Sequence, residues 1–282
     1  MMISIENALT LAVSRLETAG SPSAKMDASV LLCHILDKPS SYLFTWPERE
    51  LTPAQEVELE KCLIRRENGE PVAYITGERE FWSLPLKVAS STLIPRPDTE
   101  RLVELALDKI TPDTKAVLDL GTGTGAIALA IASECPHIQV TGVDRMEGAV
   151  SLASENGTQL GIKNARFLLS HWFDALTECA PFDMIVSNPP YIDAEDPHLS
   201  QGDVRFEPSS ALVAAENGLA DIRHICQHAQ RHLVDGGWLM FEHGCDQGAA
   251  VRQIFSDTGY SDIKTETDYA GLDRVTLGRC PG

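Results

Sequence analysis

Hydrophobic residues recur at helical spacing through the first 70 positions, and this periodicity predicts a small bundle of helices. One helix is expected over 5–16, ending before Gly20, and a second over Ala24–Leu36. A third helix begins after Thr52, where Thr-Pro-Ala-Gln forms a capping box with proline at the first helical position. In the second helix, the side chains expected to face inward are Val30, Leu31, Ile35 and Leu36.

The periodicity changes after residue 70, where prolines and glycines separate short runs of β-forming residues. Two of these runs are Tyr74–Thr76 and Leu86–Val88. We therefore expect a β-hairpin linker over 71–92, between a helical domain at 1–70 and a second domain at 93–282. The helical domain carries no obvious chemistry, and we interpret it as a substrate-docking module.

Predicted strands and helices alternate in the second domain, which is typical of an α/β protein with a mostly parallel sheet and helices on both faces. A helix is expected over 219–234, where Gly236-Gly237 would end it. The last two strands are expected to pair antiparallel and to complete a seven-stranded, doubly wound sheet. The expected strands are 116–120, 138–144, 165–169, 182–186, 238–243, 261–267 and 274–279.

The stretch Asn188-Pro189-Pro190-Tyr191 follows one of these apolar strands directly. Prolines cannot donate to a sheet ladder, so the strand must end at Asn188, at the edge where ligands bind in open α/β sheets. The Asn188 side-chain oxygen and the Pro189 carbonyl can both accept hydrogen bonds from one planar NH2 group. Tyr191 adds a flat face for such a group. The stretch therefore predicts a cradle for an amide or an exocyclic amine.

Asn-Pro-Pro-Tyr resembles the signature of amino-directed methyltransferases that use S-adenosylmethionine and act on adenine N6, cytosine N4 or a glutamine side chain. Further distinctive segments are Pro71-x-x-Tyr74-Ile75-x-Gly77, Glu80-Phe81, Ile94-Pro95-Arg96-Pro97-x-Thr99-Glu100, His198-Leu199, Gly202-Asp203 and Phe206-Glu207-Pro208. Together they resemble the HemK/PrmC family in particular. The resemblance covers nearly the whole chain and implies the class I methyltransferase fold. It also implies methyl transfer to N5 of the glutamine in the Gly-Gly-Gln motif of class I peptide chain release factors, which modulates translation termination.

A glycine-rich loop follows the strand at 116–120 and predicts a nucleotide site, because its glycines allow a tight turn and close approach to a ligand. The loop also satisfies the G-x-G-x-x-A dinucleotide fingerprint, so by itself it leaves a nicotinamide cofactor and S-adenosylmethionine open. Asp144 ends the next strand and is expected to accept from ribose hydroxyls, with a helix cap as the alternative. The loop residues assigned to the cofactor are Gly121, Thr122, Gly123, Thr124 and Gly125.

The predicted amine cradle decides between these two cofactors. A dehydrogenase that uses a nicotinamide cofactor does not need an amine-binding site after this strand. We expect S-adenosylmethionine, S-adenosylhomocysteine as its product, and no metal, with Asn188 contacting the cofactor as well as the substrate. Trp172 is expected to lie against the adenine ring, with a core tryptophan as the alternative. In the resembling family an acidic residue precedes this position, whereas this chain has His171, a weaker acceptor.

Composition restricts the partners. The 282 residues include 41 Asp and Glu against 23 Lys and Arg, a formal charge of −18 that disfavours phosphate backbones. The adjacent pair Arg65-Arg66 is interpreted as solvated helix surface. Seven scattered cysteines, no signal peptide and no membrane-spanning run favour a cytoplasmic protein with reduced thiols. We expect a monomer whose partners are release factors, without direct nucleic-acid or membrane contact.

Other readings stay open at this point. The chain could be an N6-adenine methyltransferase acting on DNA or RNA, a non-catalytic S-adenosylmethionine-binding module or, least favoured, a dehydrogenase. His224, His228 and His232 recur every four residues and could ligate a metal, but a surface stripe is preferred because no carboxylate or cysteine partner is evident. The irregular segment 192–212 is expected to form one wall of the substrate groove. Glu242-His243 ends a strand near the site and is assigned no catalytic role.

Overall fold

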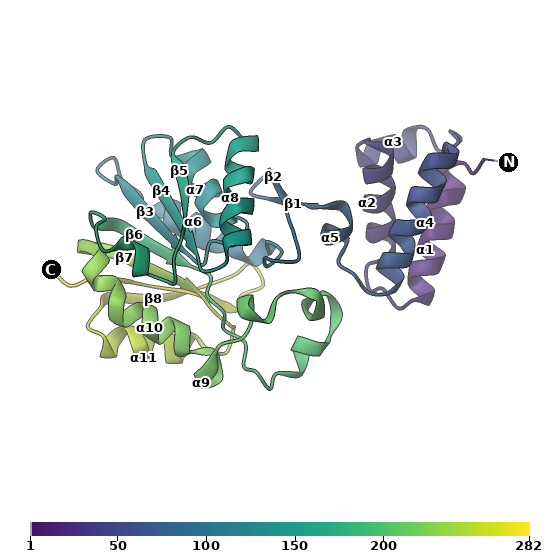
Figure 1. Ribbon diagram of the computed structural model, residues 1–282. Coiled ribbons are helices and arrows are strands. Elements are labelled where there is room, and N and C mark those ends of the chain that lie inside the picture. Colours follow the sequence, from purple (N-terminus) through teal and green to yellow (C-terminus); the bar gives the residue numbers. More distant parts are fainter. Residues whose placement is uncertain (1) are drawn as a thin grey trace. The chain divides into compact units, whose positions relative to one another are not determined.

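The computed structural model describes residues 2–282, and its contacts divide the chain into two compact units. One unit comprises the residues up to Glu78 together with Ser200–Phe206. The other comprises Arg79–Leu199 and Glu207–Gly282. Figure 1 labels most of the helices and strands of both.

The first unit is the expected helical bundle, with a core of leucine and alanine side chains. The capping box is confirmed: the Thr52 hydroxyl accepts from the Gln55 amide at 3.3 Å, and Gln55 Oε1 accepts from the Thr52 amide at 2.9 Å. Val30 does not face inward, since it is 39% exposed and Leu32 fills the core instead. The helices of this first unit are α1 (Ile5–Thr18), α2 (Ala24–Leu36), α3 (Ser40–Thr45), α4 (Pro53–Glu67) and α5 (Val72–Thr76).

The strand-like reading of Tyr74–Thr76 is wrong, because these residues end α5. Gly77 ends that helix in the left-handed region at φ 77°, where glycine has no steric penalty. The hairpin follows one residue later as the two-stranded sheet of β1 (Glu78–Phe81) and β2 (Leu84–Lys87). The sequence therefore indicated the hairpin but placed its first strand too early.

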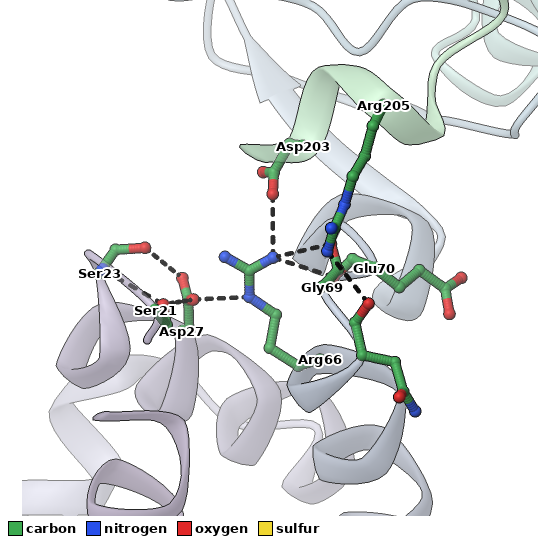
Figure 2. A network of polar contacts seen from close by, with 9 residues as sticks. Ser21, Ser23, Asp27, Arg66, Gly69, Glu70, Asp203 and Arg205 are labelled. Atoms are coloured by element: carbon green, nitrogen blue, oxygen red, sulfur yellow. Dashed lines mark hydrogen bonds and ion pairs between the residues drawn. The ribbon is translucent and has the colours of Figure 1, made fainter. Parts of the chain in front are cut away.

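Arg66 is not solvated surface: it is 8% exposed and is the centre of a polar network in the helical unit (Figure 2). Its Nε donates to Asp27 Oδ2 at 2.8 Å, and its Nη1 donates to Asp203 Oδ1 at 2.9 Å. Asp27 also accepts from the hydroxyls of Ser21 and Ser23. The prediction failed because both carboxylates come from distant parts of the chain. Asp203 lies in the 3₁₀ helix η4 (Gly202–Phe206), so this contact explains why that segment groups with the helical bundle.

The second unit contains the expected seven-stranded sheet, in the order β5-β4-β3-β6-β7-β9-β8 (Figure 1). The first five strands in that order are parallel, and β9 runs antiparallel to both of its neighbours. The strands are β3 (Ala116–Leu120), β4 (Gln139–Asp144), β5 (Ala165–Leu169), β6 (Phe182–Ser187), β7 (Leu233–Glu242), β8 (Ser261–Thr267) and β9 (Asp273–Arg279).

Alternate side chains of the central strands enter two separate hydrophobic cores, as the period of a strand requires. Val117 belongs to the core shared with α6 (Glu100–Lys109) and α7 (Ala126–Glu134). Its neighbour Leu118 belongs to the core shared with α10 (Ala220–Ala229) and α11 (Gly248–Asp257). Helices therefore cover both faces of the sheet, as predicted. The sheet unit also contains α8 (Glu147–Gln159) and the short α9 (Ala215–Gly218).

The helix expected over 219–234 is shorter than the pattern indicated. It ends at Ala229, a 3₁₀ turn follows over Gln230–His232, and β7 begins at Leu233. Gly236-Gly237 therefore lies inside a strand and does not end a helix. A Cβ at Gly237 would lie 3.0 Å from the carbonyl oxygen of Asp183, so glycine allows the irregular pairing of β7 with β6 there.

Within residues 2–282, no helix has the length and apolar character needed to cross a membrane.

Candidate active site

The parallel strands β3, β4, β5 and β6 lead at their carboxyl ends into one pocket. This edge of the sheet is where ligands bind in doubly wound folds. Of the residues predicted for the site, the structure brings eight to the pocket wall. They are Gly121, Thr122, Gly123, Thr124, Asp144, Trp172, Asn188 and Pro190. Gly125, Pro189 and Tyr191 lie beside the pocket wall without forming part of it.

The glycine loop depends on positive φ and on close packing. Gly121 has φ 71°, and a Cβ there would lie 3.7 Å from the Trp172 ring. Gly125 has φ 82°, and a Cβ there would lie 3.1 Å from Ala153, Leu129 and Phe167. Gly121 therefore lets the loop turn beneath the indole, whereas Gly125 supports the pocket by letting α7 pack closely.

Asp144 is bonded to the backbone on both sides of the pocket, and its contact with ribose hydroxyls stays a prediction. Its Oδ2 accepts from the Gly123 amide at 3.0 Å, and its Oδ1 accepts from the Met146 amide at 2.9 Å, just before α8. A carboxylate oxygen can accept more than one hydrogen bond, so capacity remains on both oxygens for hydroxyl groups of a ligand. The carboxylate thus joins the loop to the helix while it lines the pocket.

Asp119 lies beneath the loop and is fully buried. Its Oδ2 accepts from the Thr122 hydroxyl at 2.6 Å, whereas its Oδ1 has no hydrogen-bond partner among the described residues. Burial, which penalises the charged form, raises the pKa of this carboxyl to about 7. The sequence reading did not single out this residue, although an acidic residue inside an apolar strand was a visible signal.

Trp172 adopts φ 48° and lines the pocket beside His171. His171 is an exposed side chain whose Nδ1 lies 3.9 Å from Asp174 Oδ2. A second acidic residue, Asp221, lines the pocket from the first turn of α10, and burial raises its pKa. The sequence reading missed Asp221, because only the tertiary structure brings α10 to this pocket.

The Asn-Pro-Pro-Tyr stretch is held by two residues that were given no role. Asn188 Nδ2 donates to Thr99 Oγ1 at 3.2 Å. The Tyr191 hydroxyl donates to Glu242 Oε1 at 3.2 Å, and Glu242 is 1% exposed. Burial and the neighbouring Glu242 raise the pKa of Tyr191, so this phenol stays protonated at neutral pH. Tyr191 is therefore a hydrogen-bond donor and not a base.

Two of the segments that carried the family resemblance meet near this pocket. The Glu207 side chain is fully buried, and its Oε1 accepts from the Ile94 amide at 3.0 Å. Its Oε2 accepts from Arg96 Nη2 at 2.6 Å. Ser210 and Ala211 line the pocket just beyond. The expected role of 192–212 as a wall of the substrate groove stays a prediction.

The three regularly spaced histidines stack on other aromatic rings. His224 stacks on His228 with ring centroids 4.3 Å apart, and His232 stacks on Phe173 at 4.6 Å. In the part of the chain that the structure describes, no group of three or more His, Cys, Asp or Glu is placed to hold a metal ion.

Two family models match the chain, and solved structures share its fold. Residues 7–77 match the PrmC N-terminal domain, and residues 112–272 match a methyltransferase domain. A methyltransferase from Pyrococcus furiosus aligns with TM-score 0.53 and 17% identity, over 71% of this chain and 90% of its own. The Thermus thermophilus 16S rRNA N2 G1207 methyltransferase aligns with TM-score 0.52 and 20% identity, over 72% of this chain and 49% of its own. The fold and the pocket at its strand ends define a class I methyltransferase.

Full-length relatives identify the family within that class. The release factor glutamine methyltransferase of Vibrio cholerae is 63% identical over 99% of this chain and 98% of its own. That of Escherichia coli is 54% identical over 95% of this chain and 96% of its own. The chain belongs to the release factor glutamine methyltransferase family.

Proposed function

We propose that this chain transfers a methyl group from S-adenosylmethionine to the side-chain amide nitrogen of a glutamine in a peptide chain release factor. The target is N5 of the glutamine in the Gly-Gly-Gln motif of class I release factors. The observation that supports this most is the position of Asn188. It stands at the carboxyl end of β6, in the same pocket as the glycine loop and Asp144.

The residues of the pocket fit S-adenosylmethionine. Asp144 can accept from the ribose hydroxyls, because each of its oxygens already receives only one backbone hydrogen bond. Trp172 and Met146 offer apolar surface for the adenine ring. Gly121 and Gly123 let the backbone come close to the ligand. When bound, S-adenosylmethionine supplies a methyl group on a sulfonium, which is electrophilic without further activation.

The chain's own residues then act by positioning. Asn188 Oδ1 and the Pro189 carbonyl accept the two hydrogens of the glutamine amide and hold its nitrogen for in-line attack. These acceptors also stabilise the positive charge that develops on nitrogen as the methyl group arrives. Tyr191, with Pro190 beside it, orients the amide plane. No general base is assigned, because the methylated amide is acidic enough to lose its proton afterwards.

The helical region at 1–70 is proposed to dock the release factor, with 71–92 as a linker and 93–282 as the catalytic domain. The chain is proposed to act as a monomer in the cytoplasm. Its charge of −18 supports a protein substrate over a nucleic acid, because an acidic surface repels phosphates.

Transfer of labelled methyl groups tests this function directly. The purified chain is mixed with methyl-labelled S-adenosylmethionine and, in separate tubes, a class I release factor, its Gly-Gly-Ala variant, duplex DNA and single-stranded DNA. Label is expected on the wild-type factor alone. Label on DNA would place an adenine methyltransferase first, and cofactor binding without label on any substrate would indicate a non-catalytic module.

A further inference from the structure

Gln247 directly precedes α11, and its side-chain amide joins three segments of the sheet unit. Its Oε1 accepts from the backbone amide of Gly244 at 2.8 Å, in the turn that follows β7. Its Nε2 donates to the carbonyl oxygen of Tyr191 at 3.0 Å and to that of Asn217 at 3.1 Å. The end of the Asn-Pro-Pro-Tyr stretch is therefore bonded to a side chain that also holds two other loops.

The orientation of the Gln247 amide follows from its partners. A backbone N–H can only donate and a backbone carbonyl can only accept, so the oxygen of Gln247 must face Gly244. Both hydrogens of its NH2 group are then used, one for each carbonyl. The backbone amide of Gln247 also donates to the Gly244 carbonyl at 3.0 Å. The turn that carries this side chain is therefore closed by two hydrogen bonds.

The segment that supplies Asn217 has a strained backbone. Glu216 and Asn217 have φ 57° and 56°, and Gly218 follows with φ 82°. Left-handed geometry is unfavourable for residues with a Cβ, so such a run persists only where its surroundings hold it. Gly218 packs so closely here that a Cβ would lie 2.0 Å from the Tyr191 carbonyl oxygen, the same oxygen that Gln247 bonds. The position of this carbonyl is therefore fixed from two sides.

Tyr191 is held at two points, and what happens to its backbone affects the substrate cradle. Gln247 bonds its carbonyl, and Glu242 at the end of β7 accepts from its hydroxyl at 3.2 Å. The two prolines before Tyr191 have fixed φ, and a residue that precedes a proline is restricted as well. The stretch from Asn188 to Tyr191 therefore has few free torsions. A shift of the Tyr191 backbone should also move the two acceptors proposed for the substrate amide.

We propose that Gln247 is a positioning residue for methyl transfer, which holds the Asn-Pro-Pro-Tyr stretch in place through the backbone of Tyr191. The inference rests on the proposed function for its substrate. Gln247 is not one of the residues that line the pocket, so it acts on the reaction only through residues that do. Its effect is to keep the cradle acceptors where in-line attack requires them, since a misplacement of about 1 Å can cost about 10²-fold in rate.

Two substitutions at Gln247 test this role. Gln247→Glu keeps the shape of the side chain and the acceptor for Gly244 but presents an oxygen to both carbonyls. Gln247→Met keeps the length of the side chain without the hydrogen bonds. In both variants kcat should fall roughly 10- to 100-fold, because the Tyr191 carbonyl loses its donor and the cradle shifts. The KM for the release factor and the Kd for S-adenosylmethionine should change less than about threefold, since the contacts that bind them are kept.

Acidic pH should rescue only one of these two variants. In Gln247→Glu, two carbonyl oxygens would face the introduced carboxyl group and raise its pKa, and the protonated form can again donate to one of them. Between about pH 8 and about pH 5.5, its kcat relative to wild type at the same pH should recover at least about threefold. The relative kcat of Gln247→Met should stay constant. A general loss of structure would not distinguish the two variants in this way.

Gln230→Glu is the matched control. Gln230 Nε2 also donates to a backbone carbonyl, that of Thr258, and Gln230 does not line the pocket. This variant should keep kcat within about twofold of wild type, because distant sites act independently. Wild-type kcat in both Gln247 variants, an equal fall in Gln230→Glu, or the same pH response in both Gln247 variants would overturn the proposal.

Amide hydrogen exchange provides a second measurement, which needs no turnover. The Ile192 amide donates to the Leu212 carbonyl at 2.9 Å, and the Ala214 amide donates to the Ile192 carbonyl at 3.0 Å. Both bonds lie next to the contacts of Gln247, so both amides should exchange at least about tenfold faster in Gln247→Met than in the control Gln230→Glu. Equal exchange rates would contradict the proposal. If the rates differ as expected but the wild-type protein labels no release factor, the structural role of Gln247 stands and the proposed function fails.

Discussion

Hydrogen bonds to other side chains or to the backbone hold the polar side chains around the pocket in position. Asp144 holds the glycine loop, Glu242 receives Tyr191, and Thr99 receives Asn188. Buried or half-buried polar groups need such partners, because an unpaired one costs about 1–3 kcal/mol. These hydrogen bonds thus hold the side chains that surround the pocket in place.

Asn188→Ala should reduce methyl transfer to background while cofactor binding largely survives. The substitution removes an acceptor that faces the substrate, and the loss of one such group typically costs about 10²- to 10³-fold in kcat. Labelled transfer to a release factor and calorimetric binding of S-adenosylmethionine measure the two effects separately. Gln159→Ala, at the exposed end of α8 in the sheet unit, is the control. Near-normal turnover of Asn188→Ala would refute the positioning mechanism.

Asp119 should make the free energy of unfolding depend on pH. Its folded pKa of about 7 lies above its ordinary value of 3.8, so the folded state holds this proton more tightly than the unfolded state. Stability from this group is therefore present at low pH and is lost as pH rises through about 7. Relative to Asp119→Asn, the wild-type protein should lose roughly 2 kcal/mol between about pH 5.5 and 7.5. Urea unfolding at each pH measures the difference, and parallel profiles would contradict this prediction.

Helices, strands and their ends bring the site residues together. The carboxyl ends of parallel strands lie at the same edge of the sheet. Asp144 at the end of β4 and Asn188 after β6 therefore line the same pocket. The short helix α9 ends at Gly218, close to Tyr191. A Cβ at Gly218 would lie 2.0 Å from the carbonyl oxygen of Tyr191, a carbonyl that also accepts from Gln247 Nε2 at 3.0 Å.

Gly218→Ala should therefore displace Tyr191 as well as strain α9. Gly271→Ala is a matched control, since Gly271 has φ 81° against 82° at Gly218 but open space where its Cβ would lie. Both variants should lose stability from the positive φ, and Gly218→Ala should lose roughly 1–3 kcal/mol more because of the clash. Its kcat should also fall, whereas that of Gly271→Ala should not. Equal losses in both variants would mean that the contact with Tyr191 is unimportant.

Contacts between distant parts of the chain decide the extent of each unit. Residues 200–206 belong with the helical unit although 137 positions separate Arg66 from Asp203, which bond to each other. Asp27 of α2 forms an ion pair with the guanidinium of Arg66 (Figure 2). A buried charge without its partner is strongly unfavourable, so removing one member of this network should destabilise the helical unit.

Arg66→Ala should destabilise the helical unit by roughly 3–5 kcal/mol, because it leaves Asp27 buried and uncompensated. Amide hydrogen exchange should accelerate in residues 200–206, which lose a side-chain contact. The control is Arg65→Ala, whose guanidinium is 44% exposed beside Glu70 and whose loss should cost no more than about 1 kcal/mol. Similar exchange in both variants would show that Arg66 does not hold the segment.

The sequence by itself determined most of the helices and strands and the main chemistry of the site. Hydrophobic periodicity placed the helix Ala24–Leu36 and the strands Ala165–Leu169 and Ser261–Thr267 at their observed bounds. The Asn-Pro-Pro-Tyr stretch and the glycine loop indicated the site, because prolines and glycines restrict the backbone locally. Patterns of this kind depend only on residues that are close together in the sequence, so they can be recognised without knowledge of the fold.

Only the tertiary structure decided which residues become partners. The sequence gives no local sign that Thr99 receives Asn188, that Glu242 receives Tyr191, or that Arg66 is buried between two carboxylates. Each of these pairs joins residues at least 39 positions apart. A side chain's own type limits what it can bond to, but its actual partner depends on which distant segment packs beside it. That packing is set by the buried cores and the strand order of the whole fold.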